Sequence, residues 1–190
     1  MTRIILLITL IICHNANALE KCTFFLDKKY FKIGINFFLG DERLEQKGFF
    51  TDLKIKGNLY GNSIRDIIKN IEVLIPYKSL NTYSTQRDRT IYNFLLSENK
   101  KKQDHFFVKI KNLERNKARL EININNITKN INFKYDSRDV SMQSIGYIDL
   151  ADFKLLAIKG IIQDEYNKKI WNDIFIDVRA KFTKNCEQEL

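Results

Sequence analysis

The sequence has few of the residues on which catalysis and metal binding most often depend. Its 190 residues include two histidines, three cysteines and one proline, and its seven glycines are scattered singly. Isolated glycines exclude a glycine-rich phosphate loop. His14 and His105 lie far apart, so no cluster of His and Cys has metal-ligand spacing. Carboxylates are plentiful, but no spacing singles out an acid–base pair. We therefore expect no enzyme, no metal and no cofactor.

The longest apolar run lies at the N-terminus and is too short to cross a membrane. Arg3 precedes an apolar stretch over residues 4–13, and residues 16–18 read Ala-Asn-Ala. This order of a positive charge, an apolar run and a small-x-small motif is typical of a signal peptide. The apolar stretch falls short of the roughly 20 residues that a transmembrane helix needs.

These features predict export and a single domain. We expect a signal peptide over residues 1–18, cleaved after Ala18, and one domain over residues 19–190 in the periplasm. Lipidation of Cys13 is a weaker alternative, because Ile12 stands where a small residue is expected.

Two cysteines, Cys22 and Cys186, remain after that cleavage, one near each end of the domain. Cysteines of exported proteins commonly pair in the oxidising compartment. We predict a Cys22–Cys186 disulfide, and the alternative is two buried thiols.

The charge balance is basic, with 32 Lys and Arg against 23 Asp and Glu. The basic residues are spread along the whole chain and build no dense patch, and an exported protein does not meet nucleic acid, so we expect no nucleic-acid partner. The run Lys100, Lys101 and Lys102 is either a solvated loop or a contact with an anionic membrane surface. A second copy of the chain, in a homodimer, is the remaining partner considered.

Strand patterns dominate the rest of the chain. We predict extended segments over residues 31–37, 49–56, 71–77, 105–112, 119–125, 130–135, 142–150, 153–162 and 170–183. One helix is expected over about 84–96, where Ile91, Phe94 and Leu95 form an apolar stripe, and a short helix over 63–69. So many strands with one apolar face indicate a mainly β protein, an antiparallel barrel or a sandwich. The apolar interior either forms a solid core or lines a tunnel.

The most informative stretch covers residues 71–82 and the Arg87-Asp88 pair that follows. A strand with alternating apolar residues leaves the sheet through polar residues, and the pair then stands at the start of the predicted helix. Asp88 there suits the positive end of a helix dipole. The pair is therefore either a salt-bridged helix start or part of a ligand site.

Five segments, in order and spacing, resemble motifs of the YceI-like family of exported bacterial lipid-binding proteins: residues 32–37, 47–53, 71–82 with Arg87-Asp88, 124–131 and 148–153. The chain departs from the family pattern at four positions. Asn126 stands for a turn glycine, which asparagine can replace because it tolerates positive φ. Asn130 stands for a proline, Leu150 for an arginine and Lys154 for a glycine.

The resemblance implies an extended lipocalin-like antiparallel barrel of eight strands, with the helix over 84–96 packed against it. It also implies an apolar interior that holds an isoprenoid lipid, either a polyprenyl lipid or a quinone. The wall residues expected from it are Ile33, Ile35, Phe37, Phe50, Ile122, Ile124, Phe133 and Phe153. Arg87 is the expected contact for the lipid headgroup. Two alternatives stay open: a protein-interaction module with a filled barrel, and an enzyme acting on lipid through Asp or Glu at the barrel mouth.

Overall fold

The structure is a computed structural model that describes residues 21–98 and 103–187. The predicted signal peptide over residues 1–18, its cleavage after Ala18 and the lysine run at 100–102 lie outside the described residues. None of the helices within the described ranges has the length and apolar character needed to cross a bilayer.

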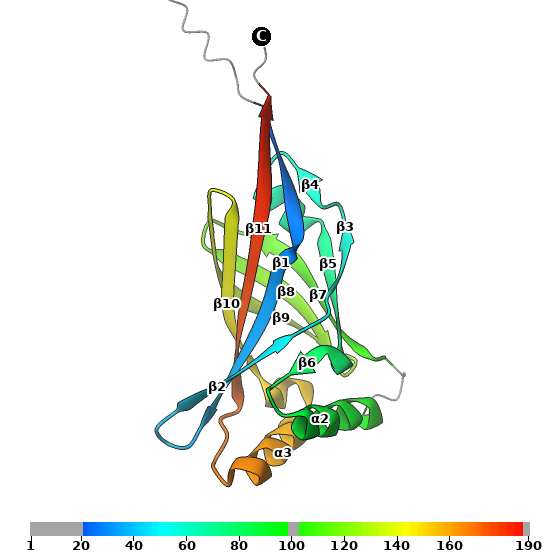
Figure 1. Cartoon of the computed structure of the whole chain (residues 1–190), viewed down its shortest axis with the longest axis vertical. Coiled ribbons are helices and arrows are strands. Elements are labelled where there is room, and N and C mark those ends of the chain that lie inside the picture. The colour runs from blue at the N-terminus through cyan, green and yellow to red at the C-terminus, as the bar shows by residue number, and fades with distance from the viewer. Residues whose placement is uncertain (1–20, 99–102, 188–190) are drawn as a thin grey trace, which may run out of the picture.

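The described residues form eleven strands in one antiparallel sheet that curls into a half-barrel (Figure 1). The strands are β1 (Lys21–Leu39), β2 (Leu44–Phe50), β3 (Lys54–Gly57), β4 (Tyr60–Gly61), β5 (Ile71–Pro76), β6 (Leu80–Asn81), β7 (His105–Leu113), β8 (Lys117–Ile124), β9 (Ile127–Arg138), β10 (Ser141–Asp149) and β11 (Asp173–Glu187). Their order in the sheet is β3-β5-β7-β8-β9-β10-β11-β1-β2-β6, with β4 beside β1. The last strand thus returns to pair with the first, which confirms the predicted antiparallel, mainly β architecture.

The prediction of eight strands corresponds to eight long segments, two of which are each divided into two strands, and the two-residue β4 is the eleventh strand. One segment contains β2 and β3, and the other contains β5 and β6, separated by a 3-10 turn, η1 (Tyr77–Ser79). Pro76 ends β5, because its nitrogen has no hydrogen to donate to a neighbouring strand. The two divided segments meet where the Thr51 amide donates to the Ser79 carbonyl at 2.8 Å, so the ends of the curled sheet come together there.

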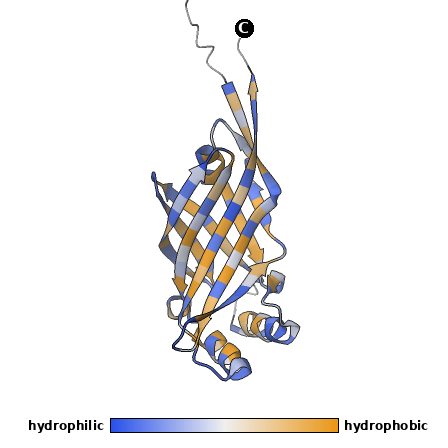
Figure 2. Cartoon of the chain, turned by 60° about the vertical axis from the view of Figure 1, so that its left-hand side comes forward, coloured by the Kyte–Doolittle hydropathy of each residue, from blue (hydrophilic) through white to orange (hydrophobic). Residues whose placement is uncertain are grey.

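Alternation along the strands places one apolar face inside the curl. In β8 the buried residues Leu120, Ile122 and Ile124 alternate with residues that are exposed or half-buried. Figure 2 shows the resulting hydrophobic and hydrophilic bands along neighbouring strands. Because successive side chains of a strand point to opposite faces, this period of two decides which side becomes the core.

Within residues 21–98 and 103–187, three α-helices join the sheet: α1 (Ile64–Lys69), α2 (Thr85–Glu98) and α3 (Leu156–Tyr166). The predictions of helices over 63–69 and 84–96 are confirmed. The Ser63 hydroxyl accepts from the Asp66 amide at 3.1 Å and caps α1, and the Ser84 hydroxyl accepts from the Arg87 amide at 3.3 Å at the start of α2.

The predicted strand over residues 153–162 is wrong. The prediction of a single main helix is therefore wrong as well. This segment ends the 3-10 turn η2 (Leu150–Phe153) and then forms α3. Leu155, Ile158 and Ile162 are buried, and their spacing of three and four residues is the period of a helix face. Helix α3 packs beside α2 at one end of the curled sheet (Figure 1).

The predicted disulfide is confirmed. Cys22 and Cys186 are directly opposite each other in the pairing of β1 with β11, and their sulfur atoms are 2.11 Å apart. The bond crosses the two-stranded ribbon that extends beyond the rest of the sheet (Figure 1).

Candidate functional site

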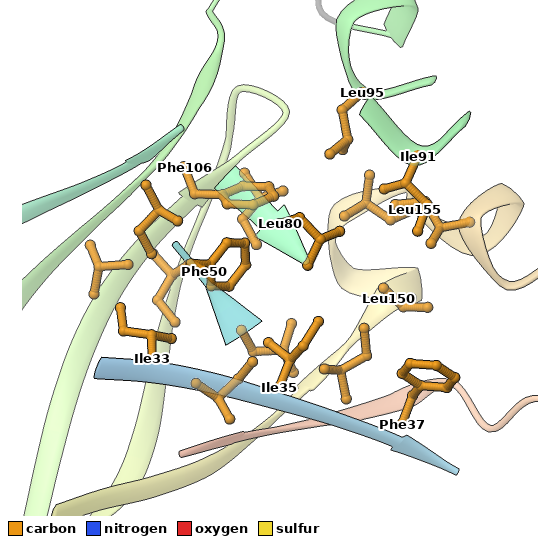
Figure 3. A pocket seen from close by; sticks show the side chains of 18 of the residues that line it. Ile33, Ile35, Phe37, Phe50, Leu80, Ile91, Leu95, Phe106, Leu150 and Leu155 are labelled. Carbon is orange, nitrogen blue, oxygen red and sulfur yellow. The ribbon is translucent and has the colours of Figure 1, made fainter. Parts of the chain in front are cut away.

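An apolar cavity of about 130 Å³ lies inside the curled sheet, at the end that α2 and α3 cover. Figure 3 shows Ile35 and Phe37 of β1 on one side and Ile91 and Leu95 of α2 on another. Every described residue of the lining except Thr82 has an apolar side chain. In another protein, a cavity of about 150 Å³ lined by Leu, Ile and Phe stays dry and binds benzene. This cavity therefore suits a hydrocarbon group better than water.

Seven of the eight side chains that the sequence places on the wall lie on this lining. They are Ile33, Ile35, Phe37, Phe50, Ile122, Ile124 and Phe133. Phe153 is fully buried in η2 but does not lie on the lining. Its place is taken by Leu150 from the same turn and by Leu155 just after it, because the chain turns into a helix there instead of continuing as a strand.

Sequence reasoning missed the contribution of the helices. Ile91 and Leu95 of α2, with Ile158 and Ile162 of α3, close the end of the cavity. The apolar stripe of α2 was visible in the sequence, but its contact with the barrel interior depends on the fold. For α3, the spacing of three and four residues between Leu155, Ile158 and Ile162 is a helical pattern that the sequence already contains.

A second cavity of about 60 Å³ continues from the first toward α1. Four apolar side chains line both cavities and form a constriction between them: Ile33, Val108, Leu120 and Val178. The second cavity ends against Ile68 of α1, and its lining includes the hydroxyl-bearing residues Tyr135 and Ser144. The interior thus consists of two adjoining chambers along the barrel.

The Arg87-Asp88 pair holds Thr82, at the point where the chain leaves β6. The Thr82 amide donates to Asp88 Oδ1 at 3.0 Å, and the Thr82 hydroxyl also donates to that carboxylate. Arg87 Nε donates to Thr82 Oγ1 at 2.8 Å, and Arg87 Nη2 donates to the Thr82 carbonyl. These contacts satisfy the hydrogen bonds of the one polar side chain that the described residues bring to the larger cavity.

Arg87 lies outside the lining, although the sequence analysis expected it at a lipid headgroup. Its Nη1 donates to the Tyr166 hydroxyl at 2.8 Å and forms an ion pair with Glu165 Oε1 at 2.8 Å. The guanidinium also lies 5.1 Å from the Tyr166 ring centre and 5.9 Å from that of Phe37. The observed contacts make it a tie between α2 and α3, immediately behind the cavity wall.

The chemistry that this lining offers is burial of apolar surface. No Lys, Arg, Asp, Glu or His among the described residues lies on either chamber's lining. Within the same part of the chain, no group of three or more His, Cys, Asp or Glu is placed to hold a metal ion.

Comparisons with known proteins agree with this geometry. The sequence family described as "YceI-like domain" matches residues 30–182. No curated protein matches the chain. Among solved structures, a polyisoprenoid binding domain from Saccharophagus degradans is similar at a TM-score of 0.59 and 12% identity, over 87% of this chain and 98% of that one.

Two further solved structures have the same fold. The YceI protein of Campylobacter jejuni is similar at a TM-score of 0.52 and 17% identity, over 75% of this chain and 85% of that one. BcnA of Burkholderia cenocepacia is similar at a TM-score of 0.50 and 9% identity, over 80% and 96%. At such identities the likeness concerns the fold.

Proposed function

Because the chain belongs to the YceI-like domain family, matched over residues 30–182, we propose that it binds an isoprenoid lipid inside its two chambers. The lipid is a polyprenyl lipid or a quinone, and the protein acts as its carrier in the periplasm. The family membership confirms the resemblance seen in five sequence segments.

The observation that carries the proposal is the apolar lining of the larger chamber. Burial of apolar surface contributes about 25 cal/mol per Å², so a long branched hydrocarbon gains much of its binding energy without any polar contact. Side chains from β1, β8, β11, α2 and α3 surround the chamber. A ligand in the chamber is therefore removed from water on several sides.

The volume of the larger chamber implies that the protein must rearrange when it binds an isoprenoid chain. The larger chamber has room for a group about as large as benzene, and an isoprenoid chain is longer than that. The chain must displace the constriction side chains between the chambers, or move the helices that cover the end. Binding is then accompanied by side-chain rearrangement around Ile33, Val108, Leu120 and Val178.

Two features support the periplasmic part of the proposal. The residues 1–18 have the order of a signal peptide, and Cys22 and Cys186 form a disulfide of the kind that persists in oxidising compartments. N-terminal sequencing of protein secreted by a bacterial host tests this part, and we expect it to begin at Leu19.

Native mass spectrometry of the protein purified without detergent tests the binding. We expect a mass increment that organic extraction removes and that fragments as an isoprenoid lipid. Protein that is empty after purification and takes up no added polyprenol or quinone refutes the proposal. That outcome, together with a co-purifying protein partner, favours the alternative of a filled barrel that serves protein interaction.

A pair of variants links any bound lipid to the chamber. Ile122→Trp adds an indole inside the larger chamber, whereas Arg119→Trp adds it to the exposed side of the same strand, β8. We expect lipid to be lost from the first variant and retained by the second. Equal lipid content in both folded variants places the ligand elsewhere.

A further inference from the structure

Three polar side chains line the two chambers within the described part of the chain: Thr82, Tyr135 and Ser144. They differ in how their hydrogen-bonding groups are used. The Thr82 hydroxyl donates to Asp88 and accepts from Arg87. It therefore has little capacity left for a ligand.

Tyr135 is in the opposite situation. Its side chain is buried, with the residue 8% exposed, and its hydroxyl has no hydrogen-bond partner among the described residues. The Ser137 hydroxyl is close enough to lower the pKa of the phenol, but the pair does not reach hydrogen-bond geometry. An unpaired buried hydroxyl destabilises a protein, and in native structures such a group often marks a missing water or ligand.

Ser144 lies next to Tyr135. The two residues are directly opposite each other in the pairing of β9 with β10, so their side chains stand side by side on the inner face of the sheet. The Ser144 hydroxyl donates to the Lys134 carbonyl at 3.1 Å, and its lone pairs remain able to accept. One unused donor and one unused acceptor therefore lie together on the smaller chamber.

We propose that Tyr135 and Ser144 form a subsite for the uncharged hydroxyl end of an isoprenoid alcohol. The ligand oxygen accepts a hydrogen bond from the Tyr135 phenol, and its proton is donated to Ser144 Oγ. This inference rests on the proposed lipid-binding function and adds to it the chemical class of the ligand's polar end and its orientation.

The surroundings select against a charged headgroup. The rest of the smaller chamber is lined by apolar side chains, among them Phe31, Ile71 and Met142, and no described cation lies on its lining. Arg65 lies near Tyr135 but outside the lining, so a phosphate buried there contacts no cation directly, and burial of an unpaired charge is strongly unfavourable. The chamber, at about 60 Å³, also accommodates only a small polar group.

The state of the phenol is consistent with a donor role. Burial raises the pKa of Tyr135 above its ordinary value, and the nearby Ser137 hydroxyl and Arg65 offset this only in part. The phenol consequently keeps its proton at neutral pH.

The subsite fixes the direction of the ligand. The smaller chamber borders α1 through Ile68, and the larger one borders α2 and α3. With its hydroxyl at Tyr135, the ligand's hydrocarbon chain runs through the constriction and points toward the two helices.

The test compares two probes: geranylgeraniol and the hydrocarbon in which a hydrogen replaces its hydroxyl. Equilibrium binding of each is measured to the wild-type protein and to the Tyr135→Phe and Ser144→Ala variants. We expect Tyr135→Phe to weaken binding of the alcohol about 2- to 13-fold, the equivalent of one hydrogen bond, and to leave binding of the hydrocarbon unchanged. Ser144→Ala is expected to act in the same direction. Tyr147→Phe, which removes the hydroxyl of an exposed tyrosine, serves as the matched control.

The outcomes separate this inference from the proposed function. Wild-type protein that binds neither of these probes nor an added quinone overturns both, and binding of the quinone alone overturns only the subsite. Protein that binds both probes, with Tyr135→Phe weakening them equally or weakening neither, overturns the subsite and leaves lipid binding intact. Geranylgeranyl phosphate binding as tightly as the alcohol also overturns the subsite.

A second measurement excludes a purely structural role for the hydroxyl. Because the hydroxyl is unpaired in the ligand-free protein, we expect Tyr135→Phe to unfold at the same denaturant concentration as the wild type or at a higher one. A lower midpoint means that the hydroxyl has a protein partner, and the subsite is then wrong.

Discussion

Arg87 on α2 and Glu165 on α3 form an ion pair of 2.8 Å that joins the two helices covering the larger chamber. The side chain of Arg87 is 2% exposed, and that of Glu165 is 40% exposed. Arg87 also donates to Thr82 on the other side. A single buried guanidinium thus connects the end of β6, α2 and α3.

Replacement of this arginine is expected to destabilise the protein. Arg87→Met keeps most of the apolar side-chain volume but removes the donors to Thr82 and Tyr166. Hydrogen bonds to charged groups contribute about 1.5–3 kcal/mol, and we expect a loss of that size in the free energy of unfolding. Denaturant titration measures it. Arg89→Met, at an exposed position of the same helix, is the control and should change stability by less than about 0.5 kcal/mol. Equal stability of the two variants would show that the contacts of Arg87 with Thr82, Tyr166 and Glu165 do not stabilise the fold.

Gly146 lies against the ring of Phe133 on the chamber wall. A Cβ atom at position 146 would lie 2.3 Å from Phe133 Cδ1, so the ring of Phe133 would have to move. Overpacking of this kind destabilises a core by about 1–3 kcal/mol, and we expect Gly146→Ala to lose that much stability and to bind lipid more weakly.

The control for Gly146→Ala lies on α3. A Cβ at Gly160 meets no atom within 4 Å. Since glycine inside a helix is about 0.5–1 kcal/mol less favourable than alanine, Gly160→Ala is expected to stabilise the protein. Thermal unfolding should show that Gly146→Ala lowers the stability and Gly160→Ala raises it. A Gly146→Ala protein with wild-type stability and full lipid binding would contradict the close contact between Gly146 and Phe133.

The Cys22–Cys186 bond closes a loop of 164 residues in sequence. Constraint of the unfolded chain by such a bond typically contributes about 2–4 kcal/mol, and a loop of this length reaches the upper part of the range. We expect the double variant Cys22→Ser, Cys186→Ser to unfold at a lower denaturant concentration than the wild type. Reductant should lower the wild-type midpoint and leave that of the double variant unchanged. Free thiols at both positions in non-reduced protein would contradict the prediction.

The buried phenol of Tyr135 predicts a dependence of stability on alkaline pH. Burial raises the pKa of Tyr135 in the folded protein above the ordinary value of about 10. At pH values between these two pKa values, the unfolded chain loses the phenol proton and the folded protein keeps it. The stability contribution is therefore complete below about pH 10 and declines as pH rises through that window.

Denaturant titrations across the alkaline range test this dependence. The decline should be smaller in Tyr135→Phe than in the wild type and unchanged in Tyr147→Phe, whose residue is exposed. Phenolate absorbance should show one transition above pH 10 disappearing in Tyr135→Phe.

Most of the sheet was predictable from the sequence because its signal is local. Alternation in β1 and β8 fixes which of their side chains face inward, and Ile33, Ile35, Phe37, Ile122 and Ile124 reach the chamber for that reason. Residues 153–162 were misread, since a short apolar run is consistent with either a strand or a helix. The spacing of three and four residues between Leu155, Ile158 and Ile162 favours a helix.

The parts of the site that escaped prediction depend on contacts between distant residues. Arg87 and Tyr166 are 79 positions apart, and nothing in either segment indicates that they meet. The contact of Gly146 with Phe133 likewise follows from the pairing of neighbouring strands. The unused hydroxyl of Tyr135 becomes visible only when every potential partner around it has been placed.

The ribbon that carries Cys22 and Cys186 stands at the pole of the molecule opposite α2 and α3 (Figure 1). Lys21 and Glu187 are paired at its tip. An affinity handle, a dye or a surface anchor attached at either side of this tip would therefore hold the protein far from the helices. Immobilised in that way, the molecule presents its helical pole outward, so exchange of lipid with vesicles can be followed on a sensor surface without blocking the helices.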